Sequence, residues 1–234
     1  MTWIYEHPNW PRFIWDSSAL AVKLAEIRHR QGWLLGRMAS VGFDLQQQAS
    51  LSILTNEVVK SSAIEGAILD PDAVRSSIAQ RLGIDIGGLM PTSRDIEGIV
   101  EMMLDATQNY RAPLTPERLF SWHAALFPTG WSGMHQITVG SWRPESAGAM
   151  QIISGPISRE TVHFEAPVAA RIESEMTRFL TWLDGERTMD PILKAGLAHL
   201  WFVTIHPFED GNGRVARAIR SEERRVGKEC RSRW

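Results

Sequence analysis

The segment from His206 to Arg217 holds the residues of this chain whose types and spacing best suit catalysis. A neutral imidazole at His206 would accept a proton from an attacking hydroxyl. Asp210 is a hard oxygen ligand of the kind that Mg²⁺ prefers beside phosphate oxygens and water. Arg214 and Arg217 lie three positions apart, so both project from one face of a helix, and their planar guanidinium groups suit phosphate oxygens. Together these residues predict a site that handles a nucleotide.

A glycine-flanked loop must position these groups. Pro207 ends the preceding helical pattern, because it removes a backbone donor and disfavours helical geometry in the residue before it. Gly211 and Gly213 permit positive φ and expose backbone N–H groups, and a helix follows directly. We therefore predict that Gly211, Asn212 and Gly213 bind an anion at a helix N-terminus, where the helix dipole favours negative charge. Phe208 would turn inward as the anchor of the loop.

Each of these features also has a purely structural interpretation. A histidine at a helix end, a Gly-Asn-Gly turn and an arginine pair on one helix face are each more often structural when they occur alone. Their occurrence together at this spacing favours the functional interpretation. His199 lies seven residues before His206 on the same helical face, but no third metal ligand is evident nearby. We interpret His199 as a core histidine or one that supports the site.

The pattern His-x-Phe-x-Asp-Gly-Asn-Gly-Arg-x-x-Arg resembles the signature of the Fic family, and every fixed position of that signature is filled. The resemblance implies an enzyme that transfers AMP from ATP to a hydroxyl side chain of a target protein. It also implies that His206 is the catalytic base, that Asp210 holds Mg²⁺ and that the loop and both arginines bind ATP. Family members that transfer phosphate have lysine in place of the second glycine, and Gly213 argues against that reaction.

Two other functions stay open. The same site can remove AMP from a target, with a glutamate orienting water. A regulatory module that only senses nucleotide is the second alternative, joined to a DNA-binding domain beyond Ile219; nucleic acid is expected as a partner only through such a missing domain. The sequence does not identify the protein substrate, for which the chain itself is one candidate, and a homodimer is a candidate assembly.

A second motif lies at the end of a predicted helix over residues 44–62. Gly66 suits the C-terminal cap of this helix. The residues Ser61, Glu65 and Gly66 have the spacing Ser-x-x-x-Glu-Gly, which resembles the inhibitory motif of some Fic proteins. There the glutamate pairs with the first arginine of the signature, here Arg214, and denies it to the γ-phosphate of ATP. The resemblance thus implies autoinhibition by Glu65.

Residues 150–154 and 161–165 are two short β-prone runs separated by a Gly-Pro turn, which predicts a hairpin. An ordinary surface hairpin is one interpretation. In Fic proteins a hairpin flap at this place pairs with an extended segment of the target, and the resemblance implies that Ile152 and Ile153 make this contact.

Apolar periodicity predicts an all-α fold with one small hairpin. The resemblance makes this fold a Fic helical bundle, truncated at its C-terminus. Residues 1–90 would form an N-terminal helical region with the inhibitory helix, and residues 91–219 an incomplete Fic core. The residues around 3–15 resemble the opening of a domain of uncharacterised role that precedes some Fic cores.

Residues 220–234 match the in-frame translation of a short-read sequencing adapter, so we interpret them as a non-native tail. A natural basic tail is the alternative. The net charge of the chain is −2, and removing the six basic and three acidic residues of the tail leaves −5. No basic excess then suggests nonspecific nucleic-acid binding. The only cysteine, Cys230, lies in the tail. With no secretory signal and no apolar run long enough for a bilayer, we expect a cytoplasmic protein without membrane contact.

Overall fold

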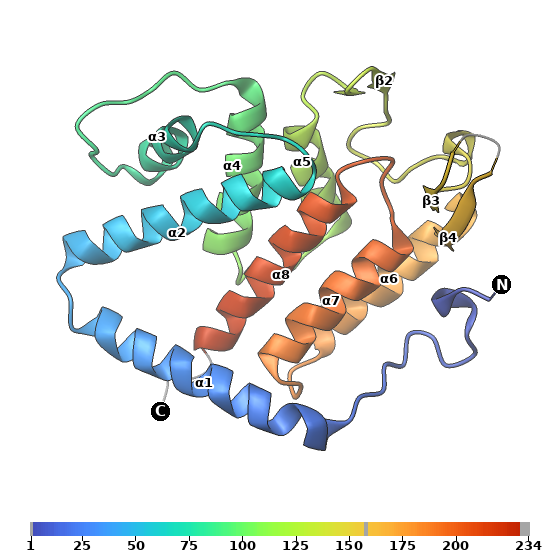
Figure 1. Cartoon of the computed structure of the whole chain (residues 1–234), viewed down its shortest axis with the longest axis horizontal. Helices are drawn as coiled ribbons and strands as arrows, with labels where there is room; N and C mark the ends of the chain where they lie inside the picture. Colours follow the sequence, from blue (N-terminus) through green and yellow to red (C-terminus); the bar gives the residue numbers. More distant parts are fainter. Residues whose placement is uncertain (1, 157–158, 230–234) are drawn as a thin grey trace. The chain divides into compact units, whose positions relative to one another are not determined.

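The computed structural model describes residues 2–156 and 159–229, and side chains up to residue 223 (Figure 1). Within these residues its secondary structure is dominated by eight α-helices, with two short 3-10 helices and a few very short strands, which confirms the predicted all-α class. The helices are α1 (Ser17–Ala39), α2 (Phe43–Ile64), α3 (Pro71–Leu82), α4 (Arg94–Gln108), α5 (Pro116–Leu126), α6 (Ala169–Gly185), α7 (Pro191–Ile205) and α8 (Asn212–Glu229). No helix in the described part of the chain is both long and apolar enough to cross a membrane.

The chain divides into two compact units. One unit is Arg12–Ile96, and the other contains the residues up to Pro11 together with those from Glu97 onward. The first residues of the chain therefore belong with the C-terminal unit. There Trp10 contacts the ring of Trp201 on α7, and its indole N–H donates to Glu175 of α6 over 3.0 Å.

The unit Arg12–Ile96 is built from α1, α2 and α3. Asp16 caps α1 by accepting hydrogen bonds from the N–H groups of Ser18 and Ala19. Helix α2 buries Leu51, Leu54 and Val58, and it packs on α3. Gly66 caps the C-terminal end of α2, as the sequence predicted. Gly66 adopts a φ of +78°, and the Ala67 N–H reaches back to the Ser62 carbonyl over 3.1 Å.

The C-terminal unit contains the segment from His206 to Arg217 that carries the signature. Figure 1 shows α6, α7 and α8 running side by side, and α7 packs against both neighbours. Phe179, Phe202 and Phe208 are fully buried there, and burial of each such ring contributes on the order of 2–3 kcal/mol. Helices α4 and α5 approach very closely at Gly98, where a Cβ would overlap the carbonyl of Ala125.

The predicted hairpin is present as β3 (Gln151–Ser154) and β4 (Thr161–Glu165), which pair antiparallel (Figure 1). A bulge shifts the register between Ile152 and Ile153. Both isoleucines are exposed, by 58% and 49%. A second, two-residue ribbon joins β1 (Trp131–Ser132) to β2 (His135–Gln136).

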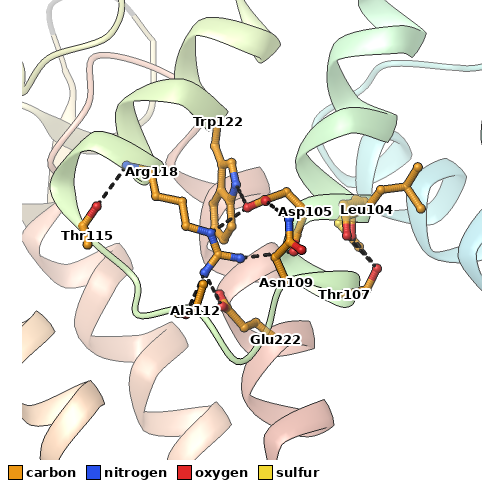
Figure 2. A network of polar contacts seen from close by, with 10 residues as sticks. Leu104, Asp105, Thr107, Asn109, Ala112, Thr115, Arg118, Trp122 and Glu222 are labelled. Atoms are coloured by element: carbon orange, nitrogen blue, oxygen red, sulfur yellow. Dashed lines mark hydrogen bonds and ion pairs between the residues drawn. The ribbon is translucent and has the colours of Figure 1, made fainter. Parts of the chain in front are cut away.

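Arg118 of α5 lies between two carboxylates, Asp105 of α4 and Glu222 of α8 (Figure 2). Its Nε and Nη1 atoms each lie 2.6 Å from one of these groups. Burial acts to raise the pKa of Asp105, but hydrogen bonds from Asn109, Arg118 and Trp122 lower it overall. One Glu222 oxygen is buried without a hydrogen-bond partner among the described residues. Burial outweighs the nearby guanidinium and raises the pKa of Glu222 to about 7.

Glu222→Gln is expected to stabilise the protein at about pH 8. The raised pKa of Glu222 means that its stabilising contribution is fully present below pH 4.5 and is lost as the pH rises through about 7. The difference corresponds to on the order of 3 kcal/mol. Urea unfolding should show this gain at about pH 8 and none near pH 4. Asp105→Asn is the matched control, because it removes a carboxylate of lowered pKa and should destabilise at about pH 8. Equal stability of the Glu222 variant and the parent at both pH values would contradict the prediction.

Candidate active site

His206 lies at the point where α7 ends. Its backbone is left-handed, with φ 53° and ψ 60°, and its N–H donates to the Phe202 carbonyl over 3.0 Å. It is the only residue other than glycine with positive φ in the described part of the chain. This conformation costs about 1–2 kcal/mol, so other contacts must hold it. The imidazole Nδ1 lies 3.3 Å from the Val203 carbonyl. A proton on Nδ1 satisfies that contact and leaves Nε2 as the basic nitrogen.

The loop after His206 is held by Phe208 and Asn212. Phe208 is fully buried, as predicted. The amide of Asn212 bonds the Phe208 backbone twice: its Oδ1 accepts from the N–H over 2.9 Å, and its Nδ2 donates to the carbonyl over 2.8 Å. Because both ends of the amide are engaged, the group of Asn212 that can face an anion is its backbone N–H at the start of α8.

The two loop glycines differ. Gly211 has a φ of +80°, and a Cβ there would come within 2.9 Å of the Phe127 ring. Both facts require glycine at this position. Gly213 is not left-handed, because it lies in the first turn of α8. Of the two loop glycines that permit positive φ, only Gly211 adopts it, because α8 already begins at Asn212.

Asp210 and Arg214 lie beside each other at this helix start. The Asp210 Oδ2 accepts a hydrogen bond from the Ser132 hydroxyl and lies 4.0 Å from Arg214 Nη2. The Arg214 guanidinium stacks over the Phe127 ring at 4.9 Å, and its Nε is buried without a hydrogen-bond partner among the described residues. A buried donor without an acceptor is costly, and an anionic oxygen would satisfy it. Arg217 follows one turn later on α8 and is 9% exposed.

The single carboxylate at this site suits a magnesium ion whose other ligands come from the substrate and from water. Asp210 supplies one carboxylate, and its side chain is 43% exposed. The described residues contain no group of three or more histidine, cysteine, aspartate or glutamate side chains arranged for a metal. Mg²⁺ does not require such a group, because it retains several waters and binds through one or two carboxylates plus phosphate oxygens.

His123 of α5 is a site residue that the sequence did not reveal. Its ring is fully buried and stacks on Phe208 with centroids 4.2 Å apart. The Gly140 N–H donates to its Nδ1 over 3.3 Å, so Nδ1 is unprotonated and the Nε2 proton donates to the Asp210 carbonyl over 3.2 Å. Burial lowers the pKa of His123 to about 4. The neutral imidazole therefore ties the backbone of the predicted metal ligand to α5.

His123→Phe is expected to destabilise the protein by about 3 kcal/mol at neutral pH, because it keeps the ring stack but leaves two backbone groups unbonded. The lowered pKa also sets a pH dependence. Stability from the neutral ring is fully present above pH 6.5 and is lost as the pH falls through about 4. Urea unfolding across this range should show that loss in the parent and not in the variant. A parallel decline in both would contradict the assignment.

The structure brings part of the predicted site together. His206, Asp210, Arg214 and Arg217 all flank the short α7–α8 turn, and Ile152 and Ile153 lie on β3 in the same compact unit. The residues of the predicted inhibitory motif, Ser61, Glu65 and Gly66, lie at the end of α2 in the other unit. His199 is half-buried on α7, and no metal cluster forms around it within the described residues.

Two family models match separate parts of the chain. Residues 113–221 match the model of the Fic/DOC family, and residues 3–84 match a domain of unknown function, DUF4172. The chain is 36% identical over 89 residues to the protein adenylyltransferase fic-1 of Caenorhabditis briggsae. That alignment covers 37% of this chain and 17% of the relative, so the chain spans a small part of that protein's length.

Solved structures share the fold. A Fic family protein from Desulfovibrio desulfuricans superposes with a TM-score of 0.59 at 25% identity, covering 94% of this chain and 61% of that one. A Fic domain containing signaling protein from Bacteroides thetaiotaomicron gives a TM-score of 0.59 at 19% identity, covering 82% and 70%.

Proposed function

This chain belongs to the Fic family, and from that premise we propose that it transfers AMP from ATP to a hydroxyl side chain of a protein. One observation carries the proposal. A left-handed histidine, a half-exposed carboxylate and a buried, unsatisfied arginine donor meet at one helix N-terminus, within nine residues of sequence from His206 to Arg214. The protein adenylyltransferases that this chain partly matches lend support.

In the proposed reaction the triphosphate lies against the start of α8. Backbone N–H groups of the first turn and the Arg214 and Arg217 side chains would bind phosphate oxygens. The Nε2 atom of His206 would take the proton of a Ser, Thr or Tyr hydroxyl as its oxygen attacks the α-phosphorus. A phosphorus–oxygen bond forms to the target, the bond between the α-phosphorus and the bridging oxygen breaks, and pyrophosphate leaves. The side chains would act mainly by positioning and by stabilising charge.

Asp210 is the residue that would hold magnesium. The ion, when bound, neutralises negative charge on the phosphates. The Ser132 hydroxyl, which donates to Asp210, would fix the orientation of the carboxylate toward that ion.

We further propose that the hairpin is the docking site for the protein substrate and that Glu65 restrains the enzyme. The exposed Ile152 and Ile153 would flank an extended target segment added to β3. Glu65 is exposed at the C-cap of α2. Its carboxylate would pair with Arg214 and withdraw that guanidinium from the γ-phosphate. One guanidinium group does not bind a carboxylate and a phosphate in a bidentate manner at the same time.

Incubation of the full chain with labelled ATP tests the reaction. Label at the α-phosphate should become protein-bound, and label at the γ-phosphate should leave as pyrophosphate. Protein-bound γ-label would overturn AMP transfer in favour of phosphotransfer. Nucleotide binding with neither label on protein, in the parent and in Glu65→Gly, would replace the proposal by a nucleotide sensor. Release of label from a previously modified target would assign the removal of AMP.

A further inference from the structure

Arg143 is a buried cation beside the candidate site. Its residue is 3% exposed, and burial lowers the pKa of its guanidinium below the ordinary value. Within the described residues it forms no ion pair with a carboxylate. Its guanidinium donates to two backbone carbonyls, and its backbone N–H donates to a third. Burying a charge is costly unless its hydrogen bonds are well placed, so the identity of these carbonyls shows what the arginine holds.

Two of the three carbonyls belong to the catalytic turn. The Arg143 Nε donates to the His206 carbonyl over 2.8 Å, and the Arg143 backbone N–H donates to the Pro207 carbonyl over 2.9 Å. These bonds fix both peptide planes that follow the left-handed φ of His206. The bond from the guanidinium is charge-assisted, and together the two bonds offset the cost of the strained backbone.

The third carbonyl belongs to the base of the hairpin. The Arg143 Nη2 donates to the carbonyl of Pro167. Pro167 lies two residues after the last residue of β4 and two residues before the first residue of α6. One guanidinium group therefore bonds the turn that carries His206 and the segment from which the hairpin emerges, although these segments lie 39 positions apart in the sequence.

We propose that Arg143 is a positioning residue that couples the hairpin to His206. This inference rests on the proposed function for its effect on AMP transfer. The target hydroxyl would be placed by the hairpin and deprotonated by His206, so the reaction requires that these two elements keep a fixed distance. Arg143 touches neither the nucleotide loop nor a reacting atom, and it acts by holding the two elements to one rigid planar group.

The coupling is first tested without any activity measurement. Hydrogen exchange of the full chain should show faster exchange in both residues 161–167 and residues 204–210 of Arg143→Lys and Arg143→Ala. Arg118→Ala is the matched control, because Arg118 is also an inward-facing arginine but bonds Asp105, Ala112 and Glu222 instead. Faster exchange in only one of the two segments, or in neither, overturns the coupling.

Kinetics then test the effect on the reaction. In the Glu65→Gly background, Arg143→Ala should lower kcat for labelling of protein by roughly 10²-fold, the scale expected for a displacement of about 1 Å. The KM for ATP should stay the same. Arg143→Lys should recover part of the rate, since its ammonium reaches one carbonyl at a time. A rise in the KM for ATP with kcat unchanged overturns the positioning role.

Chemical rescue provides the sharpest measurement. Arg143 lines a cavity of ≈ 310 Å³ together with Glu165, Pro167 and Ala170, which gives small ions a route to the space left by truncation. Guanidinium ion, well below denaturing concentration, should raise kcat of Arg143→Ala and leave Arg118→Ala unchanged. Equal effects on both variants overturn the proposal. Faster hydrogen exchange in both segments, together with no labelling of protein in any variant, would overturn the proposed AMP transfer but would still support the coupling by Arg143.

Discussion

His206→Ala is expected to lower AMP transfer by about 10²- to 10⁴-fold, the range that a general base contributes. The target hydroxyl has no other base assigned to it in the proposed reaction, and water accepts its proton poorly. Nucleotide affinity should change little, because the phosphates are assigned to the N-terminus of α8 and to Arg214 and Arg217. Single-turnover labelling with α-labelled ATP separates the two effects, since the rate should fall while the half-saturating concentration of ATP stays constant.

His199→Ala supplies the matched control for this prediction. His199 lies on the same helix as His206, is also half-buried, and has a buried Nδ1 without a partner among the described residues. Its removal should leave the labelling rate within a few-fold of the parent. Comparable losses in the two variants would mean that damage to α7, rather than loss of the base, explains the His206 result.

Several elements of the fold begin at signals that are local in the sequence. Asp70 and Pro71 open α3, and Thr115 and Pro116 open α5, because a capping side chain and a proline in the first turn act within four residues. The hairpin ends were also local, since the Gly-Pro pair separates two β-prone runs. The spacing of His206, Asp210 and Arg214 is also a local signal, since all three lie within nine residues of sequence.

Contacts between distant segments were beyond the sequence. His123 occupies a buried position of α5, and in a single sequence it looks like any core histidine. Its role depends on Gly140 and Asp210, which lie 17 and 87 positions away. The role of Arg143 could not be predicted either. Its partners are backbone carbonyls, and every residue type has a backbone carbonyl. The sequence predicted which side chains of the α7–α8 turn could take part in catalysis, but it did not predict that His123 and Arg143 bond the backbone of that turn.

The tail shows how local propensity extends a helix. The structure continues α8 to Glu229, and Glu222 and Glu223 are buried against Arg118 and Lys194. Arginine and glutamate favour helices, so the ladder of hydrogen bonds continues whatever the origin of the residues. We propose that residues 220–234 are non-native.

Glu65→Gly is expected to raise AMP transfer, including labelling of the chain itself, by about 5- to 150-fold, the usual range for coupling between two sites. The physical reason is competition for one guanidinium. When the Glu65 carboxylate is absent, Arg214 is left to the γ-phosphate, and ATP binds with its α-phosphorus in line with the hydroxyl. Glycine at the C-cap of α2 is well tolerated, so the helix itself should persist. Parallel assays of protein labelling and of helicity check both parts.

Glu65→Gln distinguishes charge from packing. Glutamine keeps the size of the side chain and loses the carboxylate, so activation by charge removal should appear in Glu65→Gln nearly as strongly as in Glu65→Gly. Adding Arg214→Ala to either variant should cancel the gain, because the arginine that Glu65 is proposed to withhold is then missing from all forms. Labelling rates that are equal with and without Glu65 would remove it from the mechanism. Activation that survives Arg214→Ala would show that Glu65 restrains the enzyme through a different residue.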